Sequence, residues 1–243
     1  MSRPSSFPLV KFGTAADGTP LSWMVSQPAG AGPWPALLGI HGGGHRTGGP
    51  STPLSVCGAD LTAAGYIVFS PQYPLTVNKL PGQVGNGQYP QQTDAIVMAF
   101  QAMKSDPRCN GSTQCFGGSA GGYMAAWLAV HGYCSAAAMS PDTDLDDPVS
   151  LQNQSFNTDV NLYAPGMLGA ASPINYVSRV TKSIYVGAYA VDNMPAPQHD
   201  NFVASLKAAG APYVEKLIPG PGHSFDMWPL VKTEVIAFLN AHK

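Results

Sequence analysis

The chain has 243 residues, of which 44% are apolar and only 11% charged, a composition typical of a compact globular protein and not of a disordered one. Its 12 basic and 14 acidic residues give a net charge of -2, and no Lys/Arg cluster marks a face for nucleic acid. We therefore expect no nucleic-acid partner.

Short apolar runs alternate with segments of helical periodicity along the chain. The first two runs, residues 8–13 and 21–26, flank an Asp17-Gly18 turn and predict an antiparallel hairpin. Six further strands are expected at residues 36–40, 66–69, 113–116, 135–139, 183–187 and 213–218. This alternation is typical of a mostly parallel sheet of about eight strands with helices on both faces.

Helical spacing of apolar residues predicts helices around residues 96–103 and 231–239, and residues 123–131 are compatible with a third. Residues 71–92 and 140–172 lack sustained periodicity, so both are expected to be long loops that border a binding site. No repeat or linker divides the chain. Residues 1–243 are therefore expected to form one α/β domain.

The N-terminal ten residues hold two prolines and several polar residues where a signal peptide needs an apolar run, and no stretch is apolar enough for a membrane-spanning helix. These features slightly favour a cytoplasmic location and no membrane partner. Cys57, Cys109, Cys115 and Cys134 lack metal-site spacing, and free thiols are favoured. A disulfide between Cys109 and Cys115, or between Cys115 and Cys134, remains an alternative.

The motif Gly-x-Ser-x-Gly occurs at residues 117–121, between an expected strand and a helix-compatible segment. A turn this tight needs small neighbours and lifts its central residue clear of the sheet. Ser119 is therefore the candidate nucleophile. A Gly-rich turn also arises for packing reasons alone, so the motif needs partners.

A serine hydroxyl becomes a good nucleophile only when a base removes its proton, and the base needs a carboxylate to orient it. His223 lies in a Pro/Gly-rich stretch after the last expected strand, and Asp192 follows the strand expected at residues 183–187. The order Ser119, Asp192, His223 is that of α/β-hydrolases.

Other histidines and carboxylates are weaker candidates. His45, His131 and His199 are interpreted as ordinary surface or packed histidines, with His199 kept as a rival base because it opens a helix after Asp192. Four acids crowd one expected loop and could serve as another triad acid, as a metal site or simply as a solvated loop, which is favoured: Asp142, Asp144, Asp146 and Asp147.

His41 and three glycines follow the strand at residues 36–40, where an oxyanion-hole loop is expected. Glycines let backbone N–H groups approach the oxygen that becomes negative during acyl transfer. We expect Gly43, Gly44 and Ala120 to donate these N–H groups. A phosphate-binding loop is not favoured, because the Lys-Ser/Thr pair of its motif is absent here. A metal site formed by His41 and His45 would need a helix, which the three glycines between them disfavour.

From about residue 10 to the C-terminus, the chain resembles the α/β-hydrolase superfamily, in particular His-Gly-Gly-Gly esterases of the hormone-sensitive-lipase-like and bacterial feruloyl or acetyl-xylan esterase-like kinds. The resemblance rests on residues 41–44, 106–108 and 117–122, on Asp192 and His223, and on Tyr73, Tyr89, Pro90 and Asp94. Pro74 stands where the family has arginine, which puts an internal ion pair in doubt. His41 lies too early for the family's helical N-terminal cap, so no large cap domain is expected.

The resemblance and the residues together predict a serine carboxylesterase that forms an acyl-enzyme on Ser119 and needs no metal or organic cofactor. The polar loops favour small esters, or esters linked to carbohydrate or aryl groups, over lipids. A prolyl-oligopeptidase-type peptidase, an acyltransferase and a non-catalytic ligand-binding relative remain alternatives. The sequence leaves the oligomeric state open.

Overall fold

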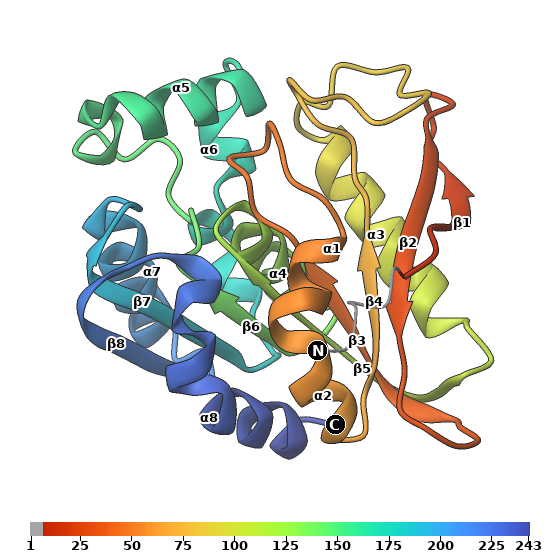
Figure 1. Cartoon of the computed structure of the whole chain (residues 1–243). Coiled ribbons are helices and arrows are strands. Elements are labelled where there is room, and N and C mark those ends of the chain that lie inside the picture. The colour runs from red at the N-terminus through yellow and green to blue at the C-terminus, as the bar shows by residue number, and fades with distance from the viewer. Residues whose placement is uncertain (1–6) are drawn as a thin grey trace.

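The computed structural model describes residues 7–243 and contains one eight-stranded sheet in the order β1-β2-β4-β3-β5-β6-β7-β8 (Figure 1). Residues 1–6, part of the segment in which no signal peptide is expected, lie outside the described residues. The strands are β1 (Val10–Thr14), β2 (Pro20–Ser26), β3 (Trp34–Ile40), β4 (Ile67–Pro71), β5 (Cys109–Gly118), β6 (Ala136–Met139), β7 (Ile184–Asp192) and β8 (Tyr213–Gly222).

The strand directions match the sequence-based expectation. β1 pairs antiparallel with β2, and β2 pairs antiparallel with β4, while all remaining neighbours are parallel. At the turn between β1 and β2, Asp17 accepts a hydrogen bond from the Thr19 N–H and Gly18 adopts a φ of 91°. The predicted Asp-Gly hairpin is thus present.

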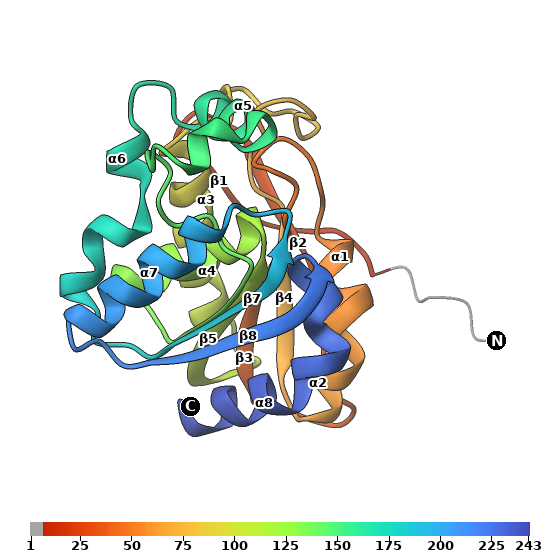
Figure 2. The ribbon, with the colours of Figure 1, turned by 90° about the vertical axis from the view of Figure 1, so that its left-hand side faces the viewer.

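Helices cover both faces of the sheet (Figure 2). Side chains alternate along each strand, so β3 directs Leu38 toward one core and Leu37 toward the other. The first face is covered by α3 (Gln91–Lys104), α4 (Ala120–Val130) and α7 (Ala196–Ala208). The second is covered by α1 (Ser51–Pro53), the π-helical turn Leu54–Gly58, α2 (Ala59–Ala63) and α8 (Trp228–Ala241).

Strands β7 and β8 run further than predicted. The ladder between them continues to the pairs Val191↔Pro221 and Asp192↔Gly222, so Asp192 is the last residue of a strand and not part of a loop. The Pro/Gly-rich stretch that follows the last expected strand in the sequence instead forms the end of β8, which runs to Gly222. Prolines are tolerated there because β8 is an edge strand of the sheet.

The prediction of a long loop at residues 140–172 is wrong. This segment contains the short 3-10 turn Ser150–Gln152, then α5 (Gln154–Tyr163) and α6 (Leu168–Ala171), and the 3-10 segment Pro173–Arg179 follows. Figure 1 shows α5 above the carboxyl ends of the central strands. Residues 72–90, by contrast, form the irregular connection that was expected before α3. Residues 7–243 contain no large cap domain.

The four cysteines are unbonded, although the sulfur of Cys115 on β5 lies 3.4 Å from that of Cys134, which stands just before β6. Over residues 7–243, no helix has both the length and the apolar character needed to cross a membrane.

Candidate active site

Ser119 occupies the turn between β5 and α4 with φ 57° and ψ -129°. A non-glycine residue in this region of backbone space is strained, and such strain is concentrated at functional sites. The turn is held from both sides, since the Ser119 N–H donates to the Met139 carbonyl at 2.8 Å and the Ser119 carbonyl accepts from Tyr123 N–H at 2.9 Å. The surrounding structure therefore imposes the conformation that presents the Ser119 hydroxyl.

The glycines of the motif are required by close backbone packing. A side chain on Gly117 would collide with the Gly121 carbonyl, and one on Gly121 would collide with the Ile40 carbonyl. A side chain on Gly118 would meet the Ser224 hydroxyl. The pattern seen in the sequence is thus the steric consequence of folding β5 directly back into α4 against the end of β3.

Asp192 and His223 come together because their strands are neighbours. Asp192 ends β7, His223 follows the last residue of β8, and the register places Asp192 opposite Gly222. The Nδ1–H of His223 donates to Asp192 Oδ1 over 2.6 Å. This bond assigns the proton to Nδ1, because a carboxylate oxygen only accepts. Nε2 is then left as the basic nitrogen of the ring.

Asp192 is held as an anion by several donors. Its side chain is only 5% exposed, and Met194 N–H donates to Oδ1 at 2.9 Å while the Ser140 hydroxyl donates to Oδ2 at 2.6 Å. Burial raises the pKa of Asp192, but the hydrogen bonds from His223, Ser140 and Met194 outweigh it, so the pKa lies below its usual value. An ionised carboxylate in this place can stabilise a protonated His223 ring.

Ser140 was missed by sequence reasoning. It follows β6 with φ 46°, and its hydroxyl accepts a hydrogen bond from the Ser224 N–H at 2.9 Å while it donates to Asp192. One side chain therefore ties the end of β6 to the acid and to the residue after His223. Its position directly after a buried parallel strand was the available signal.

The glycine loop lies against the Ser119 turn. A Cβ atom on Gly42 would stand 2.7 Å from the Gly118 oxygen and 3.0 Å from Ser119 Cβ, so only glycine allows this approach. Gly43 and Gly44 have φ values of 121° and 58°. The three glycines, Ser119 and His223 line one hollow of the surface.

The directions of the Gly43 and Gly44 N–H groups follow from the carbonyl of the preceding residue, which belongs to the same peptide group. The Gly42 carbonyl accepts from His41 Nδ1 at 2.8 Å, and the Gly43 carbonyl accepts from Thr47 N–H at 3.0 Å. Because the N–H and C=O of a trans peptide point in opposite directions, the N–H groups of Gly43 and Gly44 point away from these partners. Within residues 7–243 neither donates a hydrogen bond. Ala120 begins α4, where a helix leaves its N–H groups without internal acceptors.

His41 supports the loop as a neutral side chain. Its ring stacks on Tyr73 at 4.3 Å between centroids, and the Tyr73 hydroxyl donates to the His41 carbonyl at 2.7 Å. Burial lowers the pKa of His41 to about 4, although the hydrogen bond to Gly42 opposes the shift. The imidazole therefore stays uncharged at neutral pH and serves as a donor to the loop backbone.

A cavity of about 180 Å³ adjoins Ser119 and His223. Its wall is built from the glycine loop, from the segment after β6, from α5 and from the segment after β7. The lining residues are Gly44, Ser119, Asp142, Ser155, Phe156, Asp159, Val160, Asn193, Met194 and His223.

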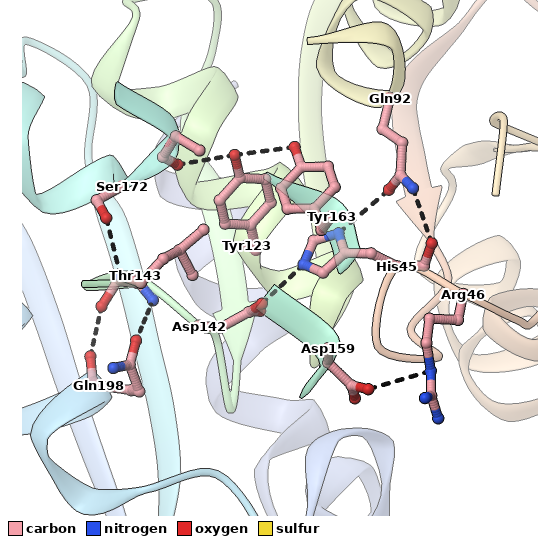
Figure 3. Close-up of polar contacts among 12 residues, drawn as sticks. His45, Arg46, Gln92, Tyr123, Asp142, Thr143, Asp159, Tyr163, Ser172 and Gln198 are labelled. Carbon is pink, nitrogen blue, oxygen red and sulfur yellow. Dashed lines mark hydrogen bonds and ion pairs between the residues drawn. The ribbon is translucent and has the colours of Figure 1, made fainter. Parts of the chain in front are cut away.

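The interpretation of Asp142 as part of a solvated loop is wrong. Its side chain is 5% exposed, and its Oδ2 lies 2.7 Å from His45 Nε2 (Figure 3). His45 is also buried, stacks on Tyr163 at 3.9 Å and bonds to Gln92 through Nδ1. Asp146 is exposed as expected, whereas Asp144 and Asp147 are half-buried and accept from Asn201.

The rival base His199 lines a small pocket together with Asp192, but no hydrogen bond joins the two side chains in the described residues. His199 is paired instead with Asp200 through Nδ1 at 2.9 Å, and its Nε2 is 3.7 Å from Glu215. His131 packs on Trp127 and bonds to that residue's carbonyl. In the part of the chain that the structure describes, no three His, Cys, Asp or Glu side chains are grouped as metal ligands.

Helix α5 carries four residues of the cavity wall, and sequence reasoning did not find it. The signals were present: Asn153 caps the helix by accepting from Phe156 N–H at 3.1 Å, and Phe156, Val160 and Tyr163 are its buried residues. These residues follow one another at intervals of four and three, the spacing of an apolar helix face.

Comparison with known proteins finds the same fold in solved structures. No protein-family model matches the sequence, and no curated relative matches it. A hyperthermophilic esterase from the archaeon Pyrobaculum calidifontis is 21% identical with a TM-score of 0.77, over 98% of this chain and 83% of that one. A hormone-sensitive lipase from a metagenome library is 19% identical with a TM-score of 0.71, over 99% and 88%.

A peptidase is also similar. Dipeptidyl peptidase 4 of Porphyromonas gingivalis is 15% identical with a TM-score of 0.75, and the match covers 99% of this chain but only 36% of the peptidase. At these identities the similarity shows the fold. The expected α/β-hydrolase fold is confirmed, with its mostly parallel eight-stranded sheet between helices.

Proposed function

We propose that this protein is a carboxylic ester hydrolase with Ser119 as nucleophile, His223 as general base and Asp192 as the acid of the triad. The observation that carries the proposal is the strained Ser119 turn beside a histidine whose Nδ1–H is already held by a buried carboxylate. Ser119 and His223 line the same cavity. The similarity to solved esterases supports the proposal through the fold.

In the proposed reaction, His223 Nε2 takes the proton of Ser119 as the hydroxyl oxygen attacks the ester carbonyl. Asp192 stabilises the imidazolium that forms. The proton then passes to the departing alkoxide, which leaves as the alcohol, and water activated by the same histidine cleaves the acyl-enzyme. In both halves of this scheme, His223 accepts the proton of the attacking group and passes it to the leaving group.

The backbone N–H groups of Gly43, Gly44 and Ala120 are the proposed donors to the oxyanion. The anchored carbonyls of Gly42 and Gly43 direct the first two, and the orphan N–H at the start of α4 supplies the third. Donors fixed before the reaction stabilise the developing charge without a reorganisation cost.

A small acyl group suits the cavity of about 180 Å³, and its mixed polar and apolar lining favours small or carbohydrate- and aryl-linked esters over long-chain lipids. The test is hydrolysis of p-nitrophenyl esters from acetate to palmitate, beside methyl ferulate and acetylated xylan. We expect the short esters to be hydrolysed fastest. A maximum at palmitate would contradict the substrate class and leave the nucleophile untouched.

The nucleophile is tested by Ser119→Ala, with the exposed Ser178→Ala as the matched control. Loss of a triad nucleophile costs roughly a millionfold in turnover, so Ser119→Ala should fall to background while the control keeps full activity. A fluorophosphonate should label the wild-type protein on Ser119 alone. Labelling of another serine, or activity in Ser119→Ala, would refute the assignment, and absence of any labelling would favour a binding-only protein.

The peptidase alternative rests on the match to one part of a dipeptidyl peptidase. An alanyl-prolyl p-nitroanilide in the same assay separates the two functions. Ester hydrolysis without anilide hydrolysis supports the esterase, whereas efficient anilide cleavage favours the peptidase.

A further inference from the structure

Two carboxylates line the cavity beside Ser119, and the catalytic scheme uses neither. Asp142 follows β6 and Asp159 projects from α5, so the chain brings them together from different segments. No lysine or arginine is among the lining residues. The basic residues that contact these acids, His45 and Arg46, are not among the lining residues (Figure 3).

Asp142 has one oxygen bound and one oxygen free. Its Oδ2 is 2.7 Å from His45 Nε2, whereas Oδ1 is buried and accepts no hydrogen bond from any of residues 7–243. A buried carboxylate oxygen without a donor is costly, and native structures usually satisfy it. Asp142 belongs to the wall of the cavity, so the wall carries a carboxylate whose hydrogen-bonding capacity the protein does not use fully.

Asp159 adds a second acceptor at the same wall. Arg46 Nε lies 3.0 Å from Oδ1, and a side chain on Gly44 would collide with Oδ2, so Oδ2 stands directly over the glycine loop. Burial raises the pKa of Asp159, and the Asp142 carboxylate raises it further against the opposing effects of Arg46 and His45. Arg46 therefore does not outweigh the effects of burial and of Asp142 on this carboxyl group.

We propose that the cavity binds a primary ammonium group carried by the acyl part of the substrate, with Asp142 and Asp159 as its acceptors. An ammonium offers three N–H donors and a positive charge, which matches two carboxylates better than a single neutral hydroxyl does. Phe156, Val160 and Met194 complete the wall with apolar surface for the carbon skeleton. The preferred substrates are esters of small amino acids, an inference that rests on the proposed esterase function.

The test compares L-alanine methyl ester with methyl isobutyrate, which replaces the ammonium by a methyl group of similar size. Methyl lactate, with a neutral hydroxyl at the same place, is the third substrate. An ammonium group also activates the neighbouring ester carbonyl chemically. The decisive quantity is therefore the ratio of kcat/KM for alanine methyl ester to kcat/KM for methyl isobutyrate, and how much this ratio changes when a carboxylate is neutralised. Hydrolysis is measured by the release of protons.

Asp142→Asn and Asp159→Asn remove the charge with little change of shape, and Glu234→Gln, at an exposed carboxylate on α8, is the charge-matched control. We expect the ratio to fall by about tenfold in each cavity variant, the size of one lost charge-assisted hydrogen bond, and to stay unchanged in the control. A fall of less than about threefold in both cavity variants overturns the proposal, as does an equal fall in the lactate-to-isobutyrate ratio.

Inhibition of the wild-type protein keeps the proposal testable if a variant does not fold. Isopropylammonium should compete with methyl isobutyrate at a concentration at least about tenfold lower than 2-propanol does. Equal inhibition by the two compounds would overturn the ammonium site. If methyl isobutyrate and the short p-nitrophenyl esters are not hydrolysed at all, the esterase function itself fails, which is a different result.

Discussion

His223 Nδ1 lies 2.6 Å from Asp192 Oδ1, and the two residues stand at the adjacent ends of the parallel strands β7 and β8. The bond sets the tautomer of the histidine ring and leaves Nε2 free to act as a base. Strand register brings the pair together, and donors from the segments after β6 and β7 hold the carboxylate in place.

Asp192→Asn should abolish most of the activity without changing the fold. An amide can donate to Nδ1 and so favour the wrong tautomer, for which a loss of roughly 10³- to 10⁴-fold in kcat is expected. Asp200→Asn, at a carboxylate whose side chain is 69% exposed, is the matched control and should keep kcat within about twofold. Steady-state kinetics on p-nitrophenyl acetate measure both. Near wild-type kcat in Asp192→Asn would mean that another group orients His223.

Ser140→Ala should impair the support that Asp192 gives to His223 and leave Ser119 itself unaffected. The hydroxyl donates to Asp192 and accepts from Ser224 N–H, so its loss should raise the pKa of Asp192 toward its usual value and lower kcat/KM about tenfold. A depressed carboxyl pKa stabilises the native state at neutral pH, and this contribution is lost as the pH falls through the native pKa.

The stability deficit of Ser140→Ala at pH 7 should therefore shrink in acid, as measured by urea unfolding across pH. Ser135→Ala, a buried serine just before β6, is the control and should show no such pH dependence. A deficit of constant size from pH 7 to pH 3 would show that Ser140 acts only through Ser224.

Gly44→Ala should disable the glycine loop. The residue has φ 58°, where an Ala side chain is disfavoured, and its Cβ would collide with Asp159. Displacement of one oxyanion donor costs on the order of 100-fold in kcat. Gly49→Ala is the matched control, because no atom lies within 4 Å of an added Cβ there and its φ is not positive. Equal activity of the two variants would exclude Gly44 from the oxyanion hole.

Burial of neutral His41 should make the protein less stable to unfolding in acid. Its pKa is about 4 in the folded protein against 6.5 for an ordinary histidine, so the unfolded chain binds more protons between these values. Stability should therefore fall as the pH drops from about 6.5 to 4, by about 3 kcal/mol in total, with no further loss from this group below pH 4.

Urea unfolding at pH 7.5, 5.5 and 4 measures the slope. His41→Phe should flatten it even if the variant is less stable overall. An identical slope in His41→Phe and the wild type would assign the acid sensitivity to other groups.

Much of the fold could be read from local patterns. Each of the eight strands corresponds to a short apolar run, and the Asp17-Gly18 turn marked the hairpin, because strand formation and tight turns depend on neighbouring residues. The strand ends were less accurate. The extension of β7 to Asp192 depends on pairing with β8, a partner that lies about 30 residues further along the chain.

The sequence by itself determined the strand–turn–helix at Ser119, since Gly117 and Gly121 are required by that turn wherever it occurs. Only the tertiary structure decided which of four nearby acids is buried. Asp142 differs from Asp144, Asp146 and Asp147 because it pairs with His45, which lies 97 residues earlier in the chain, and because α5 packs beside it. Burial and pairing over such separations depend on how the whole sheet assembles, which no local pattern of residues encodes.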